Sequence, residues 1–209
     1  MRKTLFIFTP LLLLTLLLPS TREVVAADAA TEPLEIVRSA SEAILGRVIV
    51  DKALIEKDRT HVVNLINEIL IPHINDRIMA QRVLGEAWKT ASEDARTNFT
   101  REFSRYMVRF YGQVLLLYSG EKVEYLSVEK ASQSNVRKVS SLISRAGEQP
   151  IEAAYQVELH SGEWKVTDIL VDGISMVNSN KSQFKHLIAR DGLDKVTSML
   201  ETRNNRPFR

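Results

Sequence analysis

The 209-residue sequence contains no cysteine, and this absence excludes a set of functions. Without thiols the chain has no disulfide framework, no thiolate nucleophile and no cysteine metal ligand, so its stability has to come from an apolar core. The four histidines, at positions 61, 73, 160 and 186, are scattered, and none has a partner at the spacing of a known metal-binding motif. We therefore predict no metal site and no cofactor.

Glycine-rich loops are also missing. The eight glycines are isolated, and none stands in the strand-to-helix setting of a phosphate loop or a dinucleotide fingerprint. Gly173 and Ser175 begin like a nucleophile elbow, but Met176 and Val177 stand where its second glycine is needed. We predict no catalytic residue, and we expect Ser175 to cap a helix.

Net charge is nearly absent once the N-terminus is set aside. Removing residues 1–27 lowers Lys+Arg from 28 to 25 and Asp+Glu from 26 to 25, which leaves a formal charge of zero. No basic stripe with interleaved aromatic residues remains, so we predict no nucleic-acid partner.

One long apolar run is present, and it stands at the N-terminus. Arg2 and Lys3 precede 15 mostly apolar residues, 4–18. Because a membrane-spanning helix needs about 20 apolar residues, this run favours a secretory signal peptide, with a retained anchor as the alternative. Small residues around Ala27 place the cleavage site there. We predict a signal peptide over residues 1–27 and a single domain over residues 28–209.

Helical periodicity dominates the chain up to residue 120. Apolar residues on one face predict a helix over 33–56, a second from Thr60 as N-cap to just before Pro72, and a third after Asn75 or Asp76. The clearest pattern predicts a helix of about 25 residues from the N-cap Ser92 to Gly120. Its opposite face carries Arg96, Arg101, Arg105 and Arg109. We interpret these arginines as a solvated face, with contact to a phosphate or a docking partner as the alternative.

The pattern changes to period two after Gly120. Strands are predicted near residues 122–129, 135–144, 150–160 and 163–171, and a tight turn at Ser161 and Gly162 makes the last two antiparallel neighbours. Strict alternation on the fourth strand puts Asp168 on the same face as Trp164 and Val166. Helices are expected again over residues 174–191 and 193–200, followed by a frayed tail from Arg203.

This order of elements predicts the α+β class. We expect a curved, mostly antiparallel sheet of about four strands, covered on one face by several helices, as in NTF2-like cones with an apolar cavity. Such a cone can also hold an acid such as Asp168 beside a tyrosine, as in isomerase-type enzymes. The alternative is that Asp168 bonds a backbone amide while Tyr125 and Tyr155 fill the core.

Two blocks of the sequence carry a resemblance to a known family. Residues 72–126, with Gly85, Trp88 and Tyr111, and residues 163–200, with Asp168 and Gly173, resemble the MlaC, or toluene-tolerance auxiliary, family. The chain departs from the family pattern at residues 179–181 and at Asn75, so any role of those positions in the family is not carried over.

The resemblance implies a soluble, monomeric periplasmic protein that carries a glycerophospholipid as its cargo. It implies two partners: an inner-membrane MCE-domain protein of an ABC transporter, and an outer-membrane lipoprotein–porin complex. The alternatives are a carrier in hopanoid lipid trafficking, a cavity enzyme of isomerase type, and a periplasmic adaptor without a ligand.

The predicted lipid cavity lies between the long helix and the inward face of the sheet. Each candidate residue has an ordinary core role as its alternative, because a helix over a sheet gives the same pattern with or without a cavity. The candidates are Phe103, Met107, Phe110, Val114, Tyr155, Val157, Val166 and Ile169.

Overall fold

The computed structural model describes residues 31–208. The predicted signal peptide, residues 1–27, and its cleavage point near Ala27 lie outside the described residues. Helices come first, then an antiparallel sheet, then helices again, so the predicted α+β class is confirmed. Within residues 31–208 no helix is long and apolar enough to cross a membrane.

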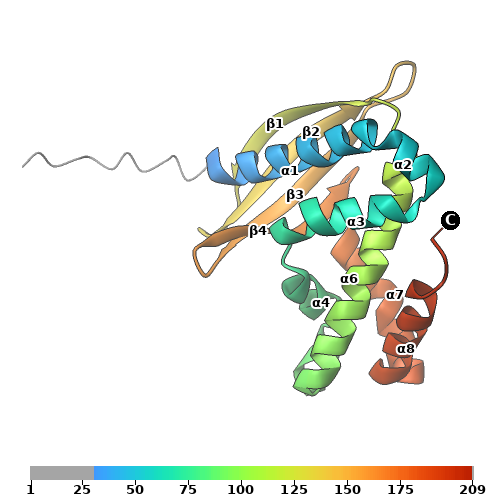
Figure 1. Ribbon diagram of the computed structural model, residues 1–209. Helices are drawn as coiled ribbons and strands as arrows, with labels where there is room; N and C mark the ends of the chain where they lie inside the picture. Colours follow the sequence, from blue (N-terminus) through green and yellow to red (C-terminus); the bar gives the residue numbers. More distant parts are fainter. Residues whose placement is uncertain (1–30, 209) are drawn as a thin grey trace, which may run out of the picture.

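The sheet has five strands in the order β1-β2-β3-β4-β5, and every neighbouring pair is antiparallel. Chain order and spatial order coincide because each strand is joined to the next by a short turn. Figure 1 shows the sheet as a curved layer. Its strands are β1 (Lys122–Lys130), β2 (Val136–Ser144), β3 (Ile151–His160), β4 (Glu163–Val171) and β5 (Ile174–Ser175).

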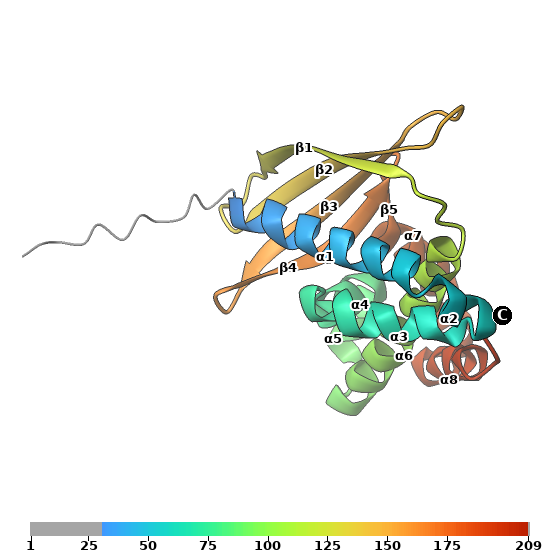
Figure 2. The same ribbon diagram turned by 45° about the horizontal axis from the view of Figure 1, so that its top comes forward.

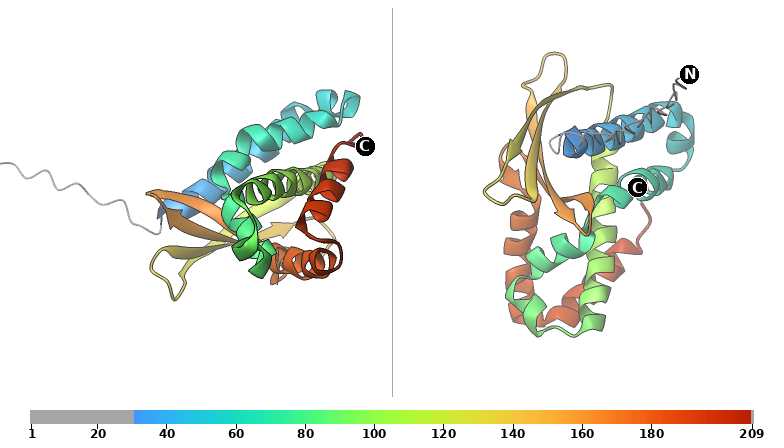
Figure 3. Two further views of the ribbon diagram at one scale, coloured as in Figure 1. Left: turned by 90° about the horizontal axis from the view of Figure 1, so that it is seen from below. Right: turned by 90° about the vertical axis from the view of Figure 1, so that its left-hand side faces the viewer.

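The helices form two groups. In Figure 2, α1 runs across one face of the sheet with α3 beside it, while the right-hand view of Figure 3 shows α4, α6, α7 and α8 extending away from the sheet as a bundle. The helices are α1 (Thr31–Val50), α2 (Lys52–Lys57), α3 (Thr60–Ile69), the 3₁₀ turn η1 (Ile71–His73), α4 (Asp76–Leu84), α5 (Glu86–Thr90), α6 (Glu93–Leu115), α7 (Met176–Asp191) and α8 (Leu193–Asn204).

The N-terminal helix predicted over residues 33–56 is two helices, because the chain leaves helical geometry at Asp51. The Asp51 carboxylate accepts hydrogen bonds from Arg47 Nη2 at 2.9 Å and pairs with His61 Nε2 at 2.8 Å, which ties the junction to α3. The predicted N-cap Thr60 is instead the first residue of α3, and the cap position falls on Arg59, whose side chain makes no capping bond. The free amide of Thr60 donates to Asp58 Oδ1 at 2.9 Å.

Three other predicted caps are present. The side chains of Asn75, Ser92 and Ser175 accept from the backbone amides of Ile78, Ala95 and Asn178, at 3.1, 3.2 and 3.0 Å. Each bond satisfies an amide that has no partner within its own helix. These three short polar residues therefore fix where α4, α6 and α7 begin.

The bundle has a core of stacked aromatic rings. Phe99 and Phe103 on α6 are parallel at 5.7 Å between ring centroids, and Phe184 on α7 meets both edge-on at 5.8 and 6.2 Å. Parallel-offset and edge-to-face contacts are the favoured aromatic geometries. Trp88 closes the end of this core, between the guanidinium groups of Arg77 and Arg96 at 5.1 and 5.4 Å from the ring centre.

The arginine face of α6 is engaged within the protein. Arg101 and Arg105 both bond the buried carboxylate of Glu102, at 3.0 and 2.9 Å, and the Asn204 side chain on α8 donates to the same carboxylate at 3.0 Å. Burial alone would raise the pKa of Glu102, but these donors lower it overall. Arg101 and Arg105 share this single carboxylate, and their side chains are 56% and 43% exposed, as expected of a solvated helix face.

The C-terminal tail is not frayed, contrary to the prediction. The Phe208 ring packs against α6, with the Arg109 guanidinium 5.2 Å from its centroid, and Arg109 also donates to the Pro207 carbonyl at 3.3 Å. A Cβ at Gly112 would lie 2.9 Å from Phe208 Cζ, so the ring fits closely because residue 112 is glycine. A single aromatic residue near the end of the chain thus holds the tail in place.

Candidate functional site

A cavity of about 490 Å³ lies between the helices α1, α3 and α6 and the face of the sheet that they cover. Its wall is mainly apolar, and a cavity of this size and character is typical of sites for small apolar ligands. The helical side of the wall includes Val37, Ala40, Ile44, Ile66, Leu70, Phe103, Met107, Tyr111 and Val114. The sheet side includes Val123, Ile143, Ile151, Ala153, Tyr155, Val166, Ile169 and Val171.

A β-bulge in β4 sets the sheet side of this wall. Val157 pairs with Val166 but Gln156 pairs with Asp168, which leaves Thr167 as an extra residue on β4. Because side chains alternate between the two faces of a sheet, one extra residue moves every following side chain of the strand to the opposite face. Val166 and Ile169 therefore both line the cavity, and the strict alternation predicted for this strand is wrong from Thr167 onward.

Asp168 consequently faces away from the cavity. Its carboxylate accepts from the backbone amides of Ile169 and Val177 at 2.8 and 3.1 Å and from the Ser175 hydroxyl at 2.5 Å. Both oxygens are thus used to hold the start of α7 against β4, which favours the structural alternative for Asp168. The cavity-facing Tyr155 lies on the other side of the sheet, so Asp168 and Tyr155 do not form the acid–tyrosine pair of an isomerase-type site.

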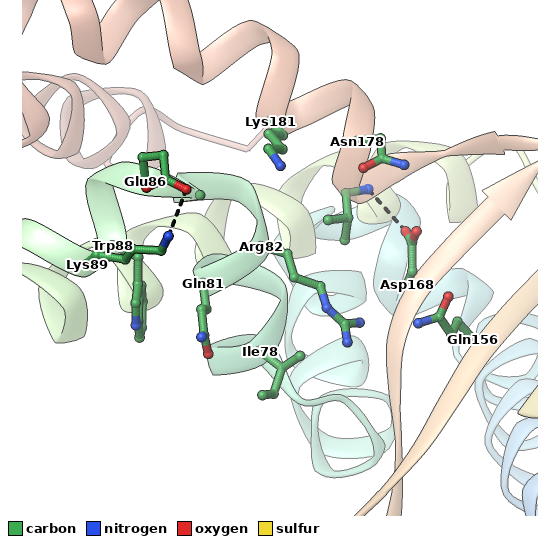
Figure 4. Close-up of a pocket in the computed structure, with 12 residues that line it drawn as sticks. Ile78, Gln81, Arg82, Glu86, Trp88, Lys89, Gln156, Asp168, Asn178 and Lys181 are labelled. Carbon is green, nitrogen blue, oxygen red and sulfur yellow. Dashed lines mark hydrogen bonds and ion pairs between the residues drawn. The ribbon is translucent and has the colours of Figure 1, made fainter. Parts of the chain in front are cut away.

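Figure 4 shows the pocket of about 470 Å³ on the Asp168 side, between α4, α5, α7 and the sheet. Its charged groups are largely paired: Lys89 donates to Glu86 at 2.9 Å, and Arg82 donates to Glu158 at 2.7 and 2.9 Å. Within residues 31–208 no group of three or more His, Asp or Glu side chains is arranged to hold a metal ion.

Six of the eight residues predicted for the cavity lie on its wall. Phe103, Met107 and Val114 project from α6, and Tyr155, Val166 and Ile169 from the sheet. That they contact a lipid stays a prediction.

The structure places the other two candidates elsewhere. Phe110 is 43% exposed at the edge of α6, because the cavity-facing side of this helix is centred between Met107 and Tyr111. Val157 is fully buried in a filled part of the sheet, where Val37 of α1 and Trp164 of β4 occupy the space beside it.

Sequence reasoning missed the part of the wall that α1 and α3 provide. Ala40, Ile44 and Ile66 lie on the apolar faces of the two predicted helices, but periodicity does not say whether such a face contacts another side chain or an empty space.

Tyr111 on α6 is a further residue of the wall that sequence reasoning missed. Burial raises the pKa of the phenols of Tyr111 and Tyr155, so both hydroxyls stay protonated and uncharged at physiological pH.

The cavity opens at the C-terminal end of α6, and its rim is partly apolar and exposed. Leu117 is 73% exposed and Val114 is 51% exposed, although both line the cavity. Beside them stand Glu121, Arg145 and Glu148, from the α6–β1 and β2–β3 connections. The cavity wall therefore changes from apolar to charged toward the opening.

Known proteins are similar to this chain in fold or in sequence. The chain is similar to a solved structure of a phospholipid-binding protein from Ralstonia solanacearum in complex with a phospholipid, with a TM-score of 0.75 and 24% identity over 83% of this chain and 97% of that chain. Among curated proteins it is 23% identical to the intermembrane phospholipid transport system binding protein MlaC of Haemophilus influenzae, over 87% of this chain and 86% of that protein. It is also 24% identical to the toluene tolerance protein ttg2D of Pseudomonas putida, over 79% of this chain and 77% of that protein.

Fold and cavity together define a binding protein of the α+β class, with helices over a curved antiparallel sheet. The family model described as MlaC protein matches residues 38–202, and the chain belongs to this family. The resemblance of residues 72–126 and 163–200 is thereby confirmed, and with it the prediction of a transport binding protein rather than an enzyme.

Proposed function

We propose that this protein carries a glycerophospholipid through the periplasm, holding the acyl chains in the cavity and leaving the headgroup at the opening. The observation that carries the proposal is the mainly apolar wall of the 490 Å³ cavity, which becomes charged only toward the ends. At about 0.8 kcal/mol per methylene, a lipid with roughly 28 chain methylenes loses on the order of 20 kcal/mol when it enters water. A carrier has to enclose the chains to remove that cost.

The proposed route runs between an outer-membrane lipoprotein–porin complex and an inner-membrane ABC transporter with an MCE-domain protein. Membership of the MlaC family supports this route, as does the name of the Haemophilus relative, which assigns that protein to an intermembrane phospholipid transport system. Residues 1–27 are proposed to be the export signal, residues 28–209 the single lipid-binding domain, and the carrier a monomer.

The test is native mass spectrometry of the protein purified without detergent, followed by extraction and identification of the bound molecule. We expect diacyl phospholipid at about one per chain. A protein that is free of lipid after purification from its own periplasm would contradict the proposal, and a hopanoid in the cavity would replace the glycerophospholipid as cargo.

Two residues on α6 give a matched pair of variants. Met107→Glu places a carboxylate on the buried part of the cavity wall, whereas Phe110→Glu places it about one turn further along, at an exposed position outside the wall. Because a charge beside acyl chains loses its hydration, we expect Met107→Glu to lower lipid occupancy severalfold and Phe110→Glu to leave it unchanged. Equal occupancy in the two variants would show that this wall does not hold the chains.

A further inference from the structure

Three charged side chains form a cluster at the opening of the cavity, hereafter the mouth cluster: Glu121, Arg145 and Glu148. Arg145 donates from Nε to Glu121 Oε1 at 2.6 Å and from Nη1 to Glu148 Oε1 at 3.2 Å. Its Nη2 group bonds Glu121 again and the Leu117 carbonyl, the latter at 3.4 Å. The cluster therefore joins the end of α6 to the β2–β3 turn.

Glu121 is a fixed negative charge. Its carboxylate is nearly buried, and burial alone would raise its pKa, but bonds from the Ser119 amide at 2.8 Å, the Ser119 hydroxyl at 3.1 Å and Arg145 lower the pKa to about 2. Arg145 is thus neutralised by a carboxylate that stays ionised under physiological conditions. Glu148, whose side chain is 58% exposed, remains as the excess charge, so the cluster carries a net charge of −1.

The other charged groups on the cavity wall do not offset this excess. Asp76 and His73 lie near η1, where the Asn75 amide bonds the Val166 carbonyl at 2.9 Å and Lys165 donates to the Pro72 carbonyl at 2.7 Å. This segment runs beside the middle of β4, where Ile74 forms a parallel bridge with Val166, whereas the mouth cluster joins the end of α6 to the β2–β3 turn. Among the described residues that line the cavity, Arg145 is the only arginine or lysine.

We propose that the mouth cluster makes the carrier prefer phospholipids whose headgroup bears an ammonium group, such as phosphatidylethanolamine, over purely anionic ones such as phosphatidylglycerol. The inference rests on the proposed function, because the chains must occupy the apolar part for the headgroup to reach the opening. The ammonium pairs with Glu148, and the phosphate accepts from the Arg145 Nη1 proton that no described group uses. The same Arg145 proton is available to the phosphate of an anionic lipid, but that headgroup has no ammonium group to offset the net negative charge of the cluster.

The experiment loads the purified protein from vesicles of equal parts phosphatidylethanolamine and phosphatidylglycerol with identical acyl chains, and measures the bound ratio after extraction. For exposed charges, we expect the wild type to favour phosphatidylethanolamine by about two- to fivefold. Glu148→Gln brings the ratio toward one, and Glu148→Lys reverses it. The preference also weakens at high salt, whereas the total lipid bound does not.

Glu86→Gln is the control, because Glu86 is an exposed, lysine-paired glutamate on α5, near the opposite end of α6. It should keep the wild-type ratio. An equal ratio in the wild type, Glu148→Gln and Glu148→Lys, with lipid bound in all three, overturns the proposal while leaving the carrier function intact. Absence of lipid from every protein would instead overturn the proposed function.

Discussion

The two halves of α6 have the same sequence pattern but different surroundings. In the N-terminal half, Phe99 is fully buried against Phe184, and this part is called the packed region. Phe103 also contacts Phe184 but lines the cavity, so it marks the boundary between the two parts. In the C-terminal half, Tyr111 and Val114 face the cavity, and Leu117, just after the end of the helix, stands at its opening; this stretch is called the hollow region. The same apolar spacing thus stabilises the fold at one end of the helix and leaves space for a ligand at the other.

The difference follows from what stands opposite each half. The packed region faces α4, α7 and α8, whose side chains interdigitate with those of α6 and fill the space. The hollow region faces a curved sheet and α1, and small residues such as Ala40 and Ala153 leave the space between them open. Stability and ligand binding should therefore respond to different substitutions along one helix.

Phe99→Ala should have the largest effect on stability. Phe99 is fully buried in the ring cluster, and removal of its ring leaves an empty space in the core. Such a change lowers the unfolding free energy by about 3–5 kcal/mol. Leu117→Ala, in the hollow region, should change it by less than about 0.5 kcal/mol. Urea unfolding of both variants checks the contrast, and similar losses would mean that the hollow region is packed in solution.

Glu158→Gln should lower the free energy of unfolding by about 2 kcal/mol at neutral pH. Arg82 and Thr167 both donate hydrogen bonds to this buried carboxylate, and bonds to a charged acceptor are the stronger ones. Burial alone would raise the pKa of Glu158, but the Gln156 amide, Arg82 and Thr167 lower it to about 2. With the folded pKa below the unfolded value of about 4.3, this stabilisation is present above pH 4.3 and is lost as pH falls toward 2.

Unfolding titrations at pH 7 and pH 3 should therefore show a smaller difference between Glu158→Gln and wild type at the lower pH. Glu163→Gln is the control, because that side chain is 71% exposed at the start of β4. A difference that does not change with pH would show that the ionised carboxylate is not the source of the stability.

Ala40→Phe should separate binding from folding in the hollow region. Ala40 lines the cavity from α1, and a phenyl ring there occupies space that the proposed acyl chains need. We expect at least a tenfold loss of affinity for the lipid, equivalent to about 1.4 kcal/mol, with the unfolding free energy nearly unchanged. Ala53→Phe, at an exposed position of α2, should retain its lipid. Full lipid occupancy in Ala40→Phe would place the lipid outside this cavity.

The smallest effect is expected where the tail meets α6. Gly112→Ala gains up to about 1 kcal/mol of helix propensity but displaces the Phe208 ring, so alone it should be nearly neutral. In a Phe208→Ala background the same change should stabilise by about 0.5–1 kcal/mol. A double-mutant cycle from thermal unfolding measures this coupling, and additive effects would indicate that the tail does not pack on α6 in solution.

The sequence by itself determined most elements and the class of the fold. Short polar residues such as Asn75, Ser92 and Ser175 fixed helix starts because their side chains bond amides only a few residues away, and period-two alternation located the four long strands. These signals are local, so they are present in the chain before it folds. The family resemblance added the expectation of a lipid, which no local pattern contains.

Only the tertiary structure decided the rest. The bulge at Thr167 turns Asp168 away from the cavity. The Phe208 ring packs beside Gly112, and Val157 packs against Val37 and Trp164 instead of lining the cavity. Each outcome depends on groups far apart in the chain, and a buried apolar residue has the same local pattern whether its neighbour is a side chain or a cavity. The location of the cavity was therefore set by packing between elements rather than by the sequence of any one of them.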